Sequence, residues 1–114
     1  MKNDKFKIVN LIKEFIVRLD NNLVNFPKKE MEIKNKIKNT SYDLLFTTYR
    51  ANVSTNKELK KELAELLVAQ VKYLDFLLNL CYDKQIINSK KYVKFGESLD
   101  DIVRHVISWM TTFK

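Results

Sequence analysis

Apolar residues recur along most of the chain three and four residues apart, which is the spacing of one face of an α-helix. Four stretches carry this pattern, over residues 4–24, 27–52, 55–83 and 88–113. No stretch alternates apolar and polar residues for long enough to predict a sheet, and no repeat of fixed length is present. The pattern therefore predicts an all-α fold, an antiparallel up-down-up-down four-helix bundle, in one domain over residues 1–114.

Each predicted helix has its own apolar row. The first row is Ile8, Ile12, Phe15, Leu19 and Leu23, and the second is Ile33, Ile37, Leu44, Leu45 and Tyr49. The third is Leu59, Leu63, Leu66, Gln70, Leu74, Leu77 and Cys81, and the fourth is Tyr92, Phe95, Leu99, Ile102, Val106, Trp109 and Phe113. The third helix is the most apolar, so we expect it to be covered on several sides, within the bundle or by another subunit.

Helix starts are also visible in the sequence. Pro27, the only proline, suits the first turn of a helix because its φ is fixed and it lacks an N–H. Thr55 and Glu58 have the spacing of a capping box, which predicts the start of the third helix. Asn88 is expected to cap the fourth helix. Gly96 lies inside that helix, where glycine costs about 1 kcal/mol relative to alanine.

The composition adds a charge to this picture. The chain has 114 residues, one glycine and one proline, which is typical of a single domain with few turns. Its net charge is +7, and residues 1–40 hold ten Lys/Arg against five Asp/Glu, or +5 of the total. A basic surface suits nucleic acid, an anionic membrane or an acidic protein, although scattered lysines more often only maintain solubility.

The candidate binding residues are basic. Five lysines crowd the start of the second predicted helix, and three arginines are the alternatives: Lys28, Lys29, Lys34, Lys36 and Lys38, then Arg18, Arg50 and Arg104. The spacing puts Lys34 with Lys38, and Lys29 with Lys36, on shared faces. Arginine suits phosphate through its planar fork, but Arg104 is also within one turn of carboxylates with which it could pair. For Trp109 core packing is favoured over an interface role.

The sequence offers little for catalysis or cofactor binding. A phosphate loop needs several glycines, and catalysis by a Cys-His pair would need Cys81 and His105 to converge. Asp101 and His105 are one turn apart, which is more often a surface hydrogen bond than a zinc site. We therefore predict a non-enzyme with no catalytic, cofactor-binding or metal residues. Cys81 continues an apolar row and is expected to be a buried thiol.

Charged residues interrupt every apolar stretch before it reaches the length of a signal peptide core or a membrane span. A cytoplasmic location is therefore the expectation. Binding to a membrane surface through the basic first helix is disfavoured, because the apolar stripe of that helix is needed for the bundle core.

Several motifs together resemble one known family. They are Asn25-Phe-Pro-Lys-Lys-Glu30, Ile37-Lys-Asn-Thr-Ser-Tyr-Asp-Leu-Leu45, Ala51-Asn52, and Asp101-Ile-Val-Arg104 followed by Trp109. In order and separation they are similar to the accessory variability determinant (Avd) proteins of diversity-generating retroelements, and to relatives encoded in intervening sequences of ribosomal RNA genes. One departure is Ile107-Ser108 before the tryptophan, where the family tends to have glycine.

The resemblance implies a function that the residues alone leave open. It implies a homopentameric barrel with a basic surface that binds RNA and DNA. It also implies association with a reverse transcriptase, supporting mutagenic reverse transcription of a template repeat RNA. The alternatives are a ribosomal intervening-sequence protein of obscure role and a basic module that binds a membrane surface or a protein.

Overall fold

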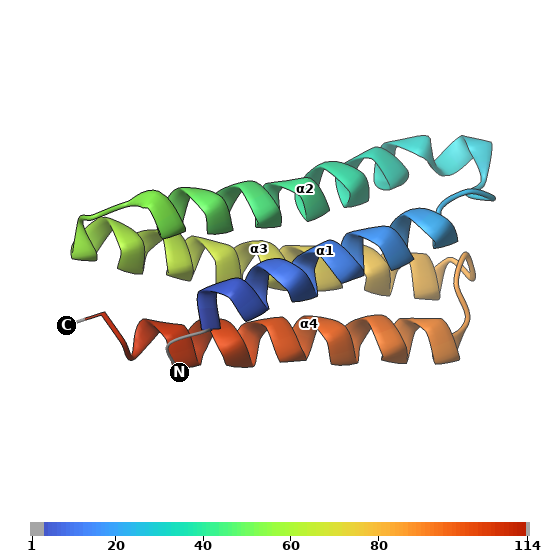
Figure 1. Ribbon diagram of the computed structural model, residues 1–114. Helices are drawn as coiled ribbons and strands as arrows, with labels where there is room; N and C mark the ends of the chain where they lie inside the picture. Colours follow the sequence, from blue (N-terminus) through green and yellow to red (C-terminus); the bar gives the residue numbers. More distant parts are fainter. Residues whose placement is uncertain (1–3, 114) are drawn as a thin grey trace.

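The protein is a four-helix bundle, as the apolar pattern predicts (Figure 1). The computed structural model describes residues 4–113, and all its regular elements over that range are helical. They are α1 (Asp4–Asn22), the short 3-10 helix η1 (Lys28–Glu30), α2 (Met31–Val53), α3 (Lys57–Asp83) and α4 (Ser89–Met110). None of these helices is long and apolar enough to cross a membrane.

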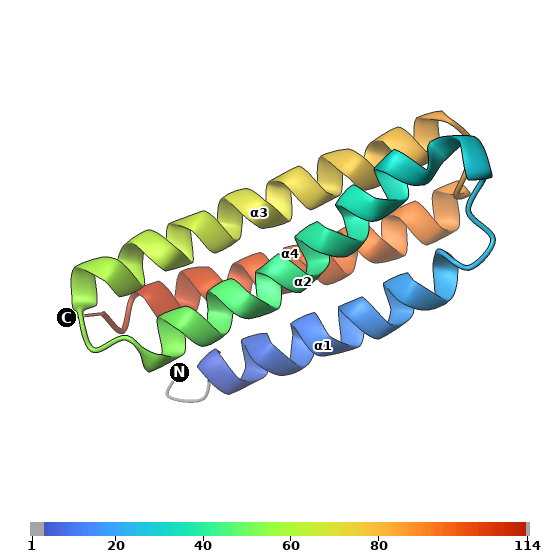
Figure 2. The same cartoon turned by 90° about the horizontal axis from the view of Figure 1, so that it is seen from above.

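The four helices form a closed ring in which each packs against two neighbours. α1 packs against α2 and α4, and α3 packs against the same two helices from the other side (Figure 2). Successive helices run antiparallel (Figure 1). The bundle measures 46 Å along its axis and 23 by 19 Å across it.

The cores of α1 and α4 follow the predicted rows. All five residues of the α1 row are buried, and so are the five central residues of the α4 row, from Phe95 to Trp109. Phe15 and Phe95 meet edge to face with their ring centroids 5.7 Å apart. Trp109 contacts Phe113 in the same way at 4.9 Å. The prediction that Trp109 packs in the core is therefore confirmed.

The core face of α2 differs from the predicted row. Ile37 and Leu44 are fully buried, but Tyr49 is 43% exposed, so its assignment to the core was wrong. Four small polar residues are buried instead: Thr40, Ser41, Thr47 and Thr48. The Thr48 hydroxyl donates to the carbonyl oxygen of Leu44 at 2.8 Å, within its own helix, and Ser41 does the same toward Lys38. A hydroxyl satisfied in this way can be buried, which apolar periodicity does not detect.

The third row contains one similar error. Leu66 is 46% exposed, and Ala64 and Leu67 are buried beside it. α3 has more apolar residues than one side of a bundle can cover, so the row alone did not decide which leucine faces inward.

The helix starts are partly as predicted. The Asn88 side chain accepts a hydrogen bond from the backbone N–H of Lys91 at 2.8 Å, which confirms the cap of α4. The capping box at Thr55 was wrong: Asn56 is the N-cap and accepts from the backbone N–H of Leu59 at 3.0 Å. Asparagine caps at least as well as threonine, and the helix starts one residue later as a result. Pro27 does precede a helix, but the first turn is the 3-10 helix η1.

Candidate nucleic-acid interface

One end of the bundle carries most of the net positive charge. The end of α1, η1, the start of α2, the end of α3 and the start of α4 all lie there, at the right of Figure 1. We call this part, residues 18–39 and 76–95, the basic end. It holds ten Lys/Arg and four Asp/Glu, which is +6 of the total charge of +7. The cations are Arg18, Lys28, Lys29, Lys34, Lys36, Lys38, Lys84, Lys90, Lys91 and Lys94.

Four of these lysines were missed in the sequence. Lys84, Lys90, Lys91 and Lys94 are about fifty residues from the predicted lysine cluster, at the α3–α4 turn. The antiparallel topology brings this turn to the same end of the bundle as η1. The sequence could have indicated these lysines, because an up-down-up-down order puts the starts of the second and fourth helices at the same end of the bundle.

The five predicted lysines, from Lys28 to Lys38, all lie at the basic end, but they do not share one face of α2. Lys34 and Lys38 are four residues apart and share one side of α2. Lys36 is two residues from each, which is about 200° around the helix, so it lies on the other side. Lys29 is in the 3-10 turn, whose three residues per turn break the helical relation to Lys36 that its spacing suggested.

The three predicted arginines lie in different places. The Arg18 guanidinium donates to the hydroxyl of Ser98 on α4, next to the basic end. Arg50 is 19 residues into α2, about 28 Å along the helix from Met31. Arg104 lies toward the same far end and is ion-paired with Asp101, as the sequence allowed. Only Arg18 joins the lysines.

An ion pair connects two segments of the basic end. The Lys84 ammonium lies 3.3 Å from a carboxylate oxygen of Glu30, which joins the end of α3 to η1. Cys81 lies one turn earlier, and it is buried and free, as predicted. Burial, with a smaller effect of the Glu30 charge, raises the pKa of the Cys81 thiol to about 11, while Lys84 acts in the opposite direction. The thiol is therefore protonated at neutral pH and is a poor nucleophile.

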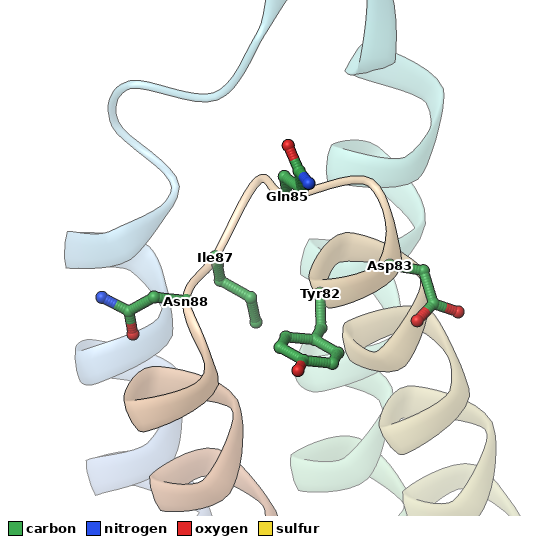
Figure 3. A pocket seen from close by; sticks show the side chains of 5 residues that line it. All are labelled: Tyr82, Asp83, Gln85, Ile87 and Asn88. Carbon is green, nitrogen blue, oxygen red and sulfur yellow. The ribbon is translucent and has the colours of Figure 1, made fainter.

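A shallow hollow of about 500 Å³ opens beside the α3–α4 turn. Five residues line it: Tyr82, Asp83, Gln85, Ile87 and Asn88. In Figure 3 the Ile87 side chain and the Tyr82 ring point toward each other, and the other three side chains point away around the rim. The Tyr82 ring is stacked on Tyr92, with ring centroids 5.3 Å apart and the planes 12° from parallel. Tyr92 is fixed in turn, because its hydroxyl accepts from the Asn79 amide at 3.0 Å.

The turn itself has one unusual residue. Gln85 has a φ of 62°, the left-handed conformation that helix ends usually reserve for glycine. The backbone N–H of Ile86 donates to the carbonyl of Cys81 at 2.8 Å, and that of Gln85 to Tyr82 at 2.9 Å. These two bonds define a Schellman motif, which closes α3 and forms one wall of the hollow.

Asp101 and His105, the pair considered for a zinc site, interact through the backbone of α4. The His105 Nδ1 atom lies 2.8 Å from the backbone oxygen of Asp101, while the Asp101 carboxylate pairs with Arg104. Among residues 4–113, no three or more His, Cys, Asp or Glu side chains are grouped so as to hold a metal ion. The pKa of the Asp75 carboxyl on α3 is raised above its usual value. Burial is the larger cause, and the charge of Asp100 on α4 is the smaller one.

The fold and this surface define a class of protein, a small four-helix bundle with its net positive charge concentrated at one end. Comparison with protein-family models, with curated protein sequences and with solved structures found no match to the chain. The charge of the basic end and the hollow beside the α3–α4 turn are therefore the basis for proposing a function.

Proposed function

We propose that this protein binds nucleic acid through its basic end and contributes no catalytic group. The observation that supports the proposal is the formal charge of +6 on residues 18–39 and 76–95. Lysines that contact phosphates release condensed counterions, so such a surface binds with an affinity that falls steeply with salt. Phosphate contacts fix position and carry no sequence information, so these lysines should give little dependence on base sequence.

Two variants with equal charge test whether the location of the lysines matters. Each replaces four exposed lysines by glutamine and changes the net charge from +7 to +3. The basic-end variant is Lys28→Gln, Lys29→Gln, Lys90→Gln and Lys91→Gln. The control variant is Lys7→Gln, Lys57→Gln, Lys61→Gln and Lys72→Gln, all outside the basic end. Fluorescence anisotropy of a labelled single-stranded RNA, between about 50 and 200 mM salt, gives the affinity and its salt dependence.

The basic-end variant should bind at least about tenfold more weakly than the parent at low salt. Its slope of log affinity against log salt should fall by up to about 3, since each phosphate contact with a single strand contributes about 0.7. The control variant should stay close to the parent in both quantities. Equal losses in the two variants would mean that only net charge matters, and the proposal would then be wrong, as it would be if the parent does not bind RNA.

We propose further that the protein assembles with copies of itself, in line with the pentamer that the resemblance implies. Exposed apolar side chains support this. Leu66, Tyr73 and Phe76 are seven and three residues apart along one side of α3, and on α2 Phe46 is 68% and Val53 79% exposed. A pentamer would have five times the chain mass of 13.6 kDa, or 68 kDa, by light scattering. Phe76→Ser with Leu66→Ser should lower that mass, and Val93→Ser on α4 should not.

The most specific proposal rests on the resemblance to the Avd family. In that role the protein would be an accessory to a reverse transcriptase of a diversity-generating retroelement. The neighbouring genes test it: a reverse transcriptase beside a variable repeat favours this role, and a surrounding ribosomal RNA gene favours the alternative. With the reverse transcriptase in hand, the basic-end variant should reduce template-primed complementary-DNA synthesis more than the control variant does.

A further inference from the structure

The hollow at the α3–α4 turn differs in chemistry from the lysines around it. The five residues that line it include no cation, and one of them, Asp83, carries a carboxylate. A phosphate would be repelled there by like charge, so the hollow does not suit the groups that the lysines bind. A neutral, flat group is the better match, because an aromatic ring and an aliphatic side chain point into the space (Figure 3).

The Tyr82 ring is built as a platform. Tyr92 supports it by stacking at 5.3 Å, and the Tyr92 hydroxyl is held by Asn79, so the pair has little freedom to rotate. Tyr82 nevertheless remains 40% exposed. A supported but accessible ring next to lysines is the arrangement in which single-stranded nucleic acids stack their bases on proteins.

Two amide side chains, Gln85 and Asn88, lie on the rim and point outward, toward where a neighbouring nucleotide of the strand would lie. Gln85 keeps an amide there although its left-handed backbone would be easier for glycine. Residues held in such sparsely populated conformations tend to cluster at binding sites. Lys84 precedes Gln85, and Lys90 follows Asn88 by two residues, so cations flank the hollow on both sides along the chain.

We infer that the hollow holds one unstacked base of a single-stranded nucleic acid, stacked on Tyr82, while lysines of the basic end bind the flanking phosphates. This inference rests on the proposed function, and it adds a preference for unpaired strands. A duplex cannot insert a base in this way without unpairing it. An abasic strand provides the same phosphates with nothing to stack.

Binding of a short single-stranded RNA, an abasic strand of equal length and a duplex tests the inference. The parent should bind the base-bearing strand more tightly than the abasic strand by about 5-fold to 150-fold, the range that stacking of one base gives. Tyr82→Leu should abolish this preference while leaving the affinity for the abasic strand unchanged. Tyr82→Phe keeps the ring and should retain it. Tyr42→Leu is the matched control, since Tyr42 is 45% exposed on α2 outside the basic end.

A measurement on the unmodified protein complements the variants. A single 2-aminopurine in the strand should lose fluorescence on binding the parent, because stacking on tyrosine quenches it. Equal affinity of the parent for base-bearing and abasic strands, or a preference that survives Tyr82→Leu, would overturn the inference and leave the proposed function standing. Failure of the parent to bind any of the three nucleic acids would overturn the proposed function itself.

Discussion

Replacing Gln85 by glycine should stabilise the protein, because this residue has the left-handed backbone that glycine adopts at no steric cost. For a residue with a Cβ this conformation costs about 1–2 kcal/mol. Glycine loses more backbone freedom on folding, which offsets about 0.5–1 kcal/mol of that gain. The Gln85 side chain is exposed, so little packing is lost. The free energy of unfolding should therefore rise by about 0.5–1 kcal/mol.

The expected shift in melting temperature follows from chain length. An unfolding entropy of about 2.1 cal/mol/K per residue gives about 0.24 kcal/mol/K for 114 residues, so Tm should rise by about 2–4 °C. Thermal unfolding followed by far-ultraviolet circular dichroism measures this shift. Gln85→Val is the control, since a β-branched residue fits the left-handed region worst and should lower Tm. A Gln85→Val variant as stable as Gln85→Gly would refute the reasoning, because the backbone could not then be left-handed.

Three other substitutions or conditions have defined outcomes. Gly96→Ala should add about 1 kcal/mol of stability by chemical denaturation, since no atom lies within 4 Å of the added Cβ; a loss would contradict that open space. Trp109→Ala should cost about 3–5 kcal/mol, because the ring is buried, and a smaller loss would mean that the ring is not in the core. Cys81 has a folded pKa above its unfolded value of 9.0, so its contribution to stability is complete below pH 9 and should be lost as pH rises to about 11. Cys81→Ala should flatten this part of the pH profile of unfolding, and an unchanged profile would argue against the raised pKa.

The fold was predictable because helical periodicity is repeated four times with few competing signals. The sequence correctly predicted which central residues of the α1 and α4 rows are buried, because every inward position there is apolar. α2 was harder, because Thr48 and Ser41 satisfy their hydroxyls on their own helix and are buried like apolar residues. Local capping was ambiguous for a related reason: Thr55 and Asn56 are adjacent and both able to cap, and only the backbone geometry shows that Asn56 does so.

The candidate interface was predictable in kind and incomplete in extent. The charge cluster at Lys28 to Lys38 is contiguous in sequence, so it was seen, whereas Lys84 to Lys94 joins it only through the topology. The Tyr82–Tyr92 stack was invisible for the same reason, since ten residues and a turn separate the rings. Among residues other than glycine, the left-handed region favours Asn, Asp and His, and because Gln85 is none of these it was not foreseen.

In the described part of the chain, Gly96 and the left-handed residue Gln85 each occupy a position that would suit the other residue type better. Gly96 occupies a helix interior where alanine would be better, and Gln85 occupies a turn where glycine would be better. Gly96 has no side chain that could contact a ligand, so Gly96→Ala should change the stability and leave the preference for base-bearing strands unchanged. Gln85 presents an amide at the rim of the hollow, so Gln85→Gly should gain stability and weaken the preference for base-bearing strands together. If Gln85→Gly gains stability but keeps the preference for base-bearing strands, the left-handed backbone has no role in binding. Tyr82 alone would then be responsible for that preference.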